Sequence, residues 1–254
     1  MLRNLLICGL IAGLCGGLLA TGFARVAGEG PIGQAIAFES AKAKAAGEHE
    51  EAPIVSRTLQ KSLGLLTAAV VYGLSVGGLF GLVFAVVYGR VGRASPARTS
   101  ILLAAFAFVV IYLVPFVKYP ANPPSVGDPN TIGRRTALYL IMILISLLAA
   151  VAAVQLRAVL ARRWSASTAT LLAGAGYLLV VVVAGWWALP SVQEVPRTFP
   201  AVTLFRFREA SIGLQAVMWT TIGLVFAATA QRVMTGQTII PRRRPSGAAA
   251  PASD

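Results

Sequence analysis

Six long apolar runs, separated by polar connections, divide the chain. Each run is long enough to cross about 30 Å of hydrocarbon as a helix. The pattern therefore predicts an all-α integral membrane protein with six transmembrane helices. The predicted spans are Leu5–Ala24, Ser62–Tyr88, Thr99–Val117, Thr136–Leu156, Ser167–Leu189 and Ala210–Ala230.

Composition agrees with this class. Hydrophobic residues make up 57% of the 254 positions and charged residues 12%, whereas a soluble domain carries about 25% charge. We expect one polytopic membrane domain over residues 1–235, followed by a low-complexity, basic and disordered tail over residues 236–254.

The first run has a second interpretation, because Arg3 and the apolar stretch after it also resemble a signal peptide. Gly22-Phe23-Ala24 is a poor cleavage site, and twenty apolar residues are long for a signal sequence. The run therefore favours a retained membrane helix.

Basic residues suggest an orientation. Arginines crowd the connections after the second and fourth spans and follow the sixth, which favours cytoplasmic N- and C-termini. The full count is even, with eleven basic residues on each side of the predicted membrane. Eight of the nine acids fall on the outer side or its boundary. The net charge of +13 is spread over membrane connections that contact anionic lipid, so we expect a bilayer partner and no nucleic acid.

Small residues recur every four positions in the first two spans. Such stripes let two helix backbones approach closely in lipid. The stripes can pack the two helices together, form an oligomer interface or line a narrow passage. The predicted packing residues are Gly9, Gly13, Gly17, Gly73, Gly77 and Gly81.

The segment Lys118–Arg135 is more elaborate than a simple connection, because four prolines in it exclude a regular helix. The connection Pro190–Arg208 is also rich in proline and ends in arginine. We expect the two to form an outer vestibule. Its predicted residues are Lys118, Tyr119, Asn122, Pro123, Pro124, Arg134 and Arg135.

The outer connections also hold the candidate metal ligands. Imidazole and carboxylate groups suit a divalent transition metal. For residues 48–51 the alternative is a solvated acidic loop. For Glu209, at the start of the sixth span, the alternative is an ion pair with Arg206 or Arg208. The candidates are Glu48, His49, Glu50, Glu51, Asp128 and Glu209.

No phosphate-binding loop, His-Glu-x-x-His motif or Gly-x-Ser-x-Gly motif is present in the sequence. We therefore expect no ATP hydrolysis by this chain and no enzyme activity.

Several motifs resemble the CbtA family of predicted cobalt-transporter subunits. They are Ser56–Leu65, Gly77-Gly78-Leu79-Phe80-Gly81, Pro115–Pro124 with Gly127-Asp128-Pro129, and Phe205–Ser211 with Trp219. The resemblance covers residues 1–235. It implies cobalt uptake across the bacterial inner membrane, a link to cobalamin synthesis and a small single-span partner, CbtB. Many members carry several histidines after the first span, whereas this chain has only His49.

Two functions follow as hypotheses. The first is a multi-pass subunit that moves cobalt inward, with the cobalt ion as cargo and no permanently bound cofactor. The second is a non-transporting scaffold or accessory subunit, since no ionisable residue lies firmly within a span. A homo-oligomer is compatible with either.

Overall fold

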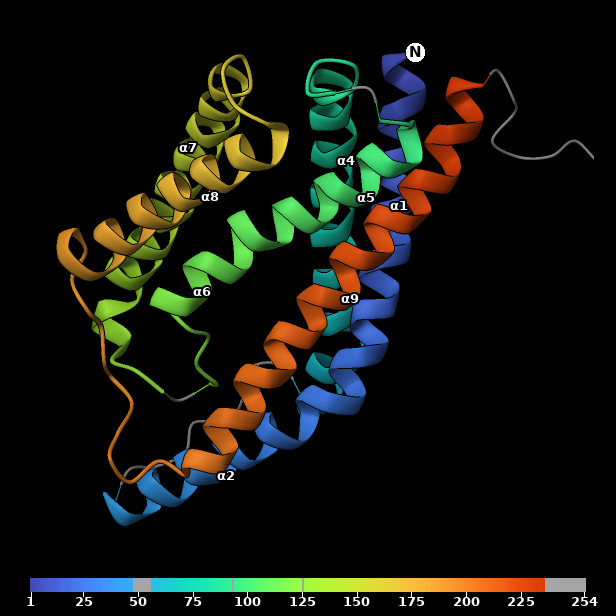
Figure 1. The fold of residues 1–254 in the computed structure, drawn as a ribbon. Helices are drawn as coiled ribbons and strands as arrows, with labels where there is room; N and C mark the ends of the chain where they lie inside the picture. Colours follow the sequence, from blue (N-terminus) through green and yellow to red (C-terminus); the bar gives the residue numbers. More distant parts are fainter. Residues whose placement is uncertain (48–55, 93, 125, 236–254) are drawn as a thin grey trace, which may run out of the picture.

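The structure, a computed structural model, describes residues 1–47, 56–92, 94–124 and 126–235. All regular elements in these ranges are helical, and six helices are long and apolar enough to cross a membrane. The prediction of an all-α protein with six spanning helices is confirmed. The start of the first helix and the end of the last lie at the same end of the bundle (Figure 1). The predicted tail, residues 236–254, lies outside the described residues.

The first spanning helix continues well past Ala24, where the sequence predicted a loop. Helix α1 (Leu2–Phe23) passes through a π-helical turn, η1 (Ala24–Gly28), into α2 (Glu29–Ala45). The prediction of a loop here was wrong, because residues 29–45 are rich in good helix formers such as alanine, lysine and glutamate. Pro31 has no N–H for the helical ladder, which accounts for the irregular turn before it. Helix α2 consequently runs at an angle to α1 (Figure 1).

The other spans follow the predicted runs with longer ends. The second contains a short α3 (Arg57–Leu59), η2 (Gln60–Gly64) and α4 (Leu65–Val87). The third contains α5 (Pro96–Ala107), η3 (Phe108–Leu113) and α6 (Val114–Lys118). The remaining elements are η4 (Pro129–Thr131), α7 (Ile132–Leu160), α8 (Ala166–Val183), η5 (Ala184–Ala188) and α9 (Ala201–Met234).

Helices α1 and α4 pack with their backbones in contact. Gly9 lies against Gly77, and Gly13 lies against both Gly73 and Gly77, so the two stripes run antiparallel. A Cβ atom on Gly77 would overlap the carbonyl group of Gly9. All six predicted packing glycines face the other helix of this pair. The interface therefore depends on the absence of side chains.

Helix α1 also packs against α9 through its other side. A Cβ atom added to Gly16 would lie 3.1 Å from a side-chain carbon of Ile222. Helix α9 then packs against α5, where Ser100 Oγ donates a hydrogen bond of 2.8 Å to the Gly223 carbonyl. The spatial order is thus α4, α1, α9, α5.

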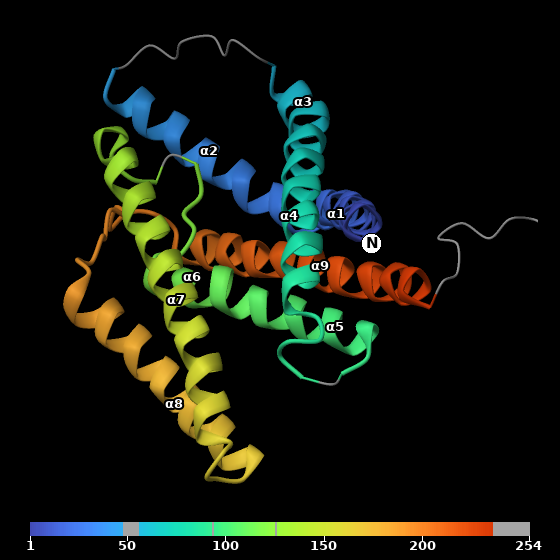
Figure 2. The same ribbon diagram turned by 90° about the horizontal axis from the view of Figure 1, so that it is seen from above.

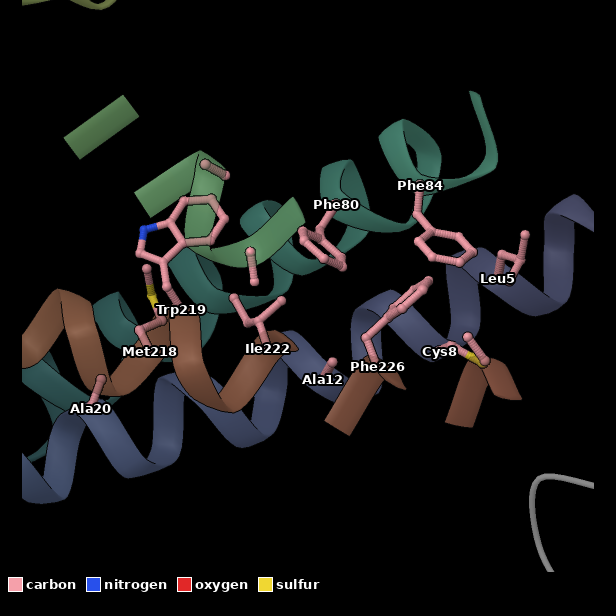
Figure 3. Packing of buried hydrophobic residues seen from close by; sticks show 13 residues of the cluster. Leu5, Cys8, Ala12, Ala20, Phe80, Phe84, Met218, Trp219, Ile222 and Phe226 are labelled. Carbon is pink, nitrogen blue, oxygen red and sulfur yellow. The ribbon is translucent and has the colours of Figure 1, made fainter. Parts of the chain in front are cut away.

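A buried cluster fills the space where α1, α4 and α9 meet (Figure 3). Phe80 and Phe84 from α4 converge on Phe226 from α9, with ring centroids 5.1 and 4.8 Å from the Phe226 ring. Ile222 and Cys8 are fully buried in the same cluster, and the Cys8 thiol forms no disulfide. Because lipid is as apolar as these side chains, close packing rather than water exclusion stabilises the cluster.

Helices α7 and α8 form a hairpin that leans away from the other spans (Figures 1 and 2). Met142 and Ala149 of α7 pack with Val181 of α8. The hydroxyl groups of Ser146 and Tyr177 also lie within hydrogen-bond distance, 2.8 Å apart. The hairpin joins the rest of the bundle through contacts of α7 with η3 and α6.

A proline explains the polar contact at this junction. In η3 the N–H of Val114 bonds to the carbonyl of Val109, five residues back. The next N–H in that register would come from Pro115, which has none. The Val110 carbonyl instead accepts a hydrogen bond of 2.7 Å from Ser146 Oγ. Since an unpaired carbonyl is costly in lipid, this bond fixes the hairpin to η3.

The glycine interface predicts opposite effects for two alanine substitutions. Gly77→Ala should lower the free energy of unfolding by about 1–3 kcal/mol, because the added methyl group overlaps α1. Gly22→Ala should leave stability unchanged or slightly higher, because nothing lies within 4 Å of its Cβ position. Unfolding in mixed detergent micelles measures both. Equal effects would contradict the interface.

At the Pro115 junction, two substitutions should have non-additive effects on the free energy of unfolding. Ser146→Ala should lower the free energy of unfolding by about 1 kcal/mol, because it leaves the Val110 carbonyl unpaired. In a Pro115→Ala background the new N–H can satisfy that carbonyl, so the same change should cost less. A double-mutant cycle by the same unfolding assay tests this. An equal cost in both backgrounds would contradict it.

Candidate functional site

A cavity of about 1590 Å³ lies at the end of the bundle opposite the start of α1. Its walls come from α2, from the Lys118–Arg135 segment, from the connection between η5 and α9, and from the first turns of α9. It reaches into the spanning helices as far as Tyr112 in η3 and Tyr139 in α7. We call it the loop cavity. Its size and depth make it the best candidate for a ligand site.

Hydrogen bonds join the two proline-rich connections at one wall. Tyr119 Oη donates to the Pro190 carbonyl at 2.8 Å, and Lys118 Nζ donates to Ser191 Oγ at 3.3 Å. Burial raises the pKa of Tyr119, and the nearby Arg134 charge opposes part of that rise. The phenol therefore remains protonated and available as a donor at neutral pH.

An ion pair joins the same two connections further along. Arg135 Nε lies 3.3 Å from Glu194 Oε2, and the Asp128 N–H donates to the same oxygen at 3.0 Å. The Thr131 hydroxyl, the Asp128 N–H and the Arg135 guanidinium hold the pKa of Glu194 below its usual range. We call this contact the Glu194 latch. Gly127, with φ of +116°, lies so close to the Arg135 guanidinium that a Cβ atom there would overlap it.

Helix α2 closes the cavity from another side. Its Ala35 is buried with Val126 and Phe199, one residue from each connection. The rings of Phe38 and Phe199 meet edge to face with centroids 5.1 Å apart. This small apolar cluster holds α2 against the ends of both connections.

Arg208 forms a further wall from the first turns of α9. Its Nη2 donates to Asn122 Oδ1 at 2.9 Å, and its Nε donates to the Ala121 carbonyl at 3.3 Å. Both acceptors are neutral. The guanidinium is partly buried and lines the loop cavity.

A family model described as probable cobalt transporter subunit (CbtA) matches residues 2–231. The chain belongs to the CbtA family. No curated protein and no solved structure matches the chain.

In this CbtA-family chain, six of the seven predicted vestibule residues line the loop cavity. The exception is Arg134, which is exposed and lies outside the lining. The lining members are Lys118, Tyr119, Asn122, Pro123, Pro124 and Arg135.

The structure does not bring the predicted metal ligands together. Asp128 Oδ1 accepts hydrogen bonds from the backbone and side-chain amides of Asn130, and so caps η4. Glu209 is exposed on α9 and does not line the cavity. Across the described ranges, no three His, Cys, Asp or Glu side chains form a group that could hold a metal ion. Residues Glu48, His49, Glu50 and Glu51 lie outside the described residues.

Sequence reasoning missed three parts of the site: the helical α2 wall, the Glu194 latch and the role of Arg208. In the latch, Glu194 contacts Asp128, which lies 66 positions earlier, and Arg135 in the same earlier connection. No local motif indicates contacts between residues so far apart in the sequence. The helix-forming composition of residues 29–45 was a usable signal for α2.

The Glu194 latch predicts a stability difference that depends on pH. Since the folded pKa of Glu194 lies below the unfolded value of 4.5, the latch is fully present above that value. Its contribution is lost as pH falls through the folded pKa. Glu194→Gln should therefore lower the unfolding temperature at pH 7, and the difference from the unmodified protein should shrink below about pH 4.

Thermal unfolding of the purified protein across pH 3.5–8 measures this difference. Glu209→Gln is the matched control, because that carboxylate is exposed and outside the cavity lining. A pH-independent difference for Glu194→Gln would contradict the latch.

Proposed function

We propose that this protein is the membrane subunit of a cobalt-uptake transporter in the bacterial inner membrane. The observation that carries the proposal is a large cavity in a CbtA-family protein that reaches from the connections into the spanning helices. Such a cavity gives cargo an entry into the bundle from one side. The protein acts by binding and conduction, without enzyme catalysis.

In this proposal both termini lie in the cytoplasm and the loop cavity opens to the outside. Arginines on the connections at the end of the bundle opposite the cavity support this orientation. These include Arg90 between α4 and α5, and Arg162 and Arg163 between α7 and α8. Figure 1 shows both connections at the end of the bundle where α1 starts. Uptake would then begin at the cavity.

The family description calls its members subunits, and we propose a small single-span CbtB-like partner. Apolar side chains exposed along α4 and α8 leave surface for such a helix, for lipid or for a second copy of the chain. The role in cobalamin synthesis is part of this proposal, since cobalt is the metal of that cofactor.

A non-transporting accessory subunit is the second candidate. The absence of a metal-holding group among the described residues favours it. In that case the protein would position a conducting partner, and the loop cavity would not be on the path of the metal.

Uptake of cobalt-57 tests the proposal. Cells that produce the chain with its partner should accumulate several-fold more cobalt than vector controls at submicromolar cobalt, because the cavity gives the metal a specific entry. Protein in the membrane fraction must be verified in every strain. No gain over vector would remove the transport proposal.

A bulky side chain on the cavity wall separates the two candidates. Ala43 on α2 lines the cavity, whereas Ala45 on the same helix is exposed and does not. Ala43→Trp, which narrows the cavity, should lower uptake in a transporter, and Ala45→Trp should preserve it. An accessory subunit would keep uptake in both variants. Glu209→Ala tests the proposed ligand role of Glu209 in the same assay.

A further inference from the structure

The charged lining of the loop cavity is mainly basic. Among the described residues, the ionised side chains on its walls are Glu39 and four basic groups, Lys42, Lys118, Arg135 and Arg208. A wall of this composition attracts anions and repels a free divalent cation. The lining charge therefore does not match aquated Co²⁺, the cargo expected from the family resemblance together with the acidic residues of the outer connections.

Among the described residues, Lys118 and Arg208 contact neutral oxygens rather than a carboxylate. Arg135 is paired with Glu194. Lys118 donates to the hydroxyl of Ser191, and Arg208 donates to an amide oxygen and a backbone carbonyl. A partly buried guanidinium bound only to neutral oxygens is unfavourable, and its planar donors suit a carboxylate.

The size and the aromatic lining indicate an organic ligand. The cavity of about 1590 Å³ has room for a drug-sized ligand, whose sites typically measure about 300–1,000 Å³. Aromatic rings line it from several elements, and such rings bind flat or apolar parts of a ligand. The ring-bearing residues are Phe38, Tyr112, Phe116, Tyr119, Tyr139, Trp186 and Phe207.

We propose that the loop cavity receives cobalt as an anionic chelate whose carboxylate groups contact Arg208 and Lys118. This inference rests on the proposed cobalt-uptake function and specifies the form of its cargo. The chelator supplies the metal ligands, which explains how the site works without a group of three metal-binding side chains in the described part of the chain. The basic wall recognises the net negative charge of the complex.

Binding to the purified full-length protein in lipid nanodiscs tests the inference by calorimetry. The probes are aquated Co²⁺ and its complexes with citrate, nitrilotriacetate and ethylenediaminetetraacetate, each of which carries net negative charge. At least one complex should bind at least tenfold more tightly than aquated Co²⁺. Its affinity should fall as salt rises, because the attraction is electrostatic.

Three variants locate the site. Arg208→Gln should weaken binding of the complex about tenfold by removing a charge-assisted hydrogen bond. Lys42→Gln should weaken it by a smaller factor and should preserve folding, because Lys42 is exposed on α2 where it lines the cavity. Arg206→Gln is the matched control, because Arg206 is exposed on the same helix and does not line the cavity.

Three results would overturn the inference: tighter binding of aquated Co²⁺ than of every complex, no binding of any of the three complexes, or unchanged affinity in both cavity variants. Cobalt-57 uptake separates this failure from that of the proposed function. If uptake persists without chelate binding, the chelate inference is wrong and the transport proposal stands. Chelate binding without uptake of cobalt in any form removes the transport proposal.

Discussion

Direct backbone contact between α1 and α4 is the constraint on which the remaining helices depend. It requires small residues where the two helices cross, and it places α4 so close that Phe80 and Phe84 reach Phe226 beside the first turns of α1. Helix α9 occupies the other side of α1, and α5 packs on α9. The α7–α8 hairpin then attaches through η3 rather than through α1. The loop cavity forms between these two parts, because the hairpin leans away from the glycine-packed helices.

Helical irregularities gather at the end of the spans near this cavity. The π-helical segments η1, η2, η3 and η5 each lie in the half of their span nearer the cavity. Proline contributes to two of them, since Pro31 follows η1 and Pro115 follows η3. A carbonyl without a helical partner is tolerated where a side chain such as Ser146 can satisfy it. At the Pro115 junction, a carbonyl that lacks a helical partner therefore forms a contact between η3 and α7.

The sequence predicted those features of the fold that depend on local residue patterns. Apolar runs located six spans, glycine spacing located the α1–α4 contact, and prolines located the connections that line the cavity. It did not predict contacts made by single polar side chains from separate connections, such as Arg135 with Glu194. It also placed a loop where α2 forms, because the change from apolar to polar residues after Ala24 indicates the end of a span and not the end of a helix.

The even division of basic residues between the two sides now has a physical interpretation. A membrane protein oriented by its arginines should carry fewer basic residues on the outside. Here Arg135 is held by Glu194, Arg208 by Asn122, and Lys118 by Ser191, all within the walls of one cavity. The fold holds these three charges in place. In the proposed orientation with cytoplasmic termini, they count among the basic residues of the outer side, and leaving them out moves the balance of basic residues toward the cytoplasmic side.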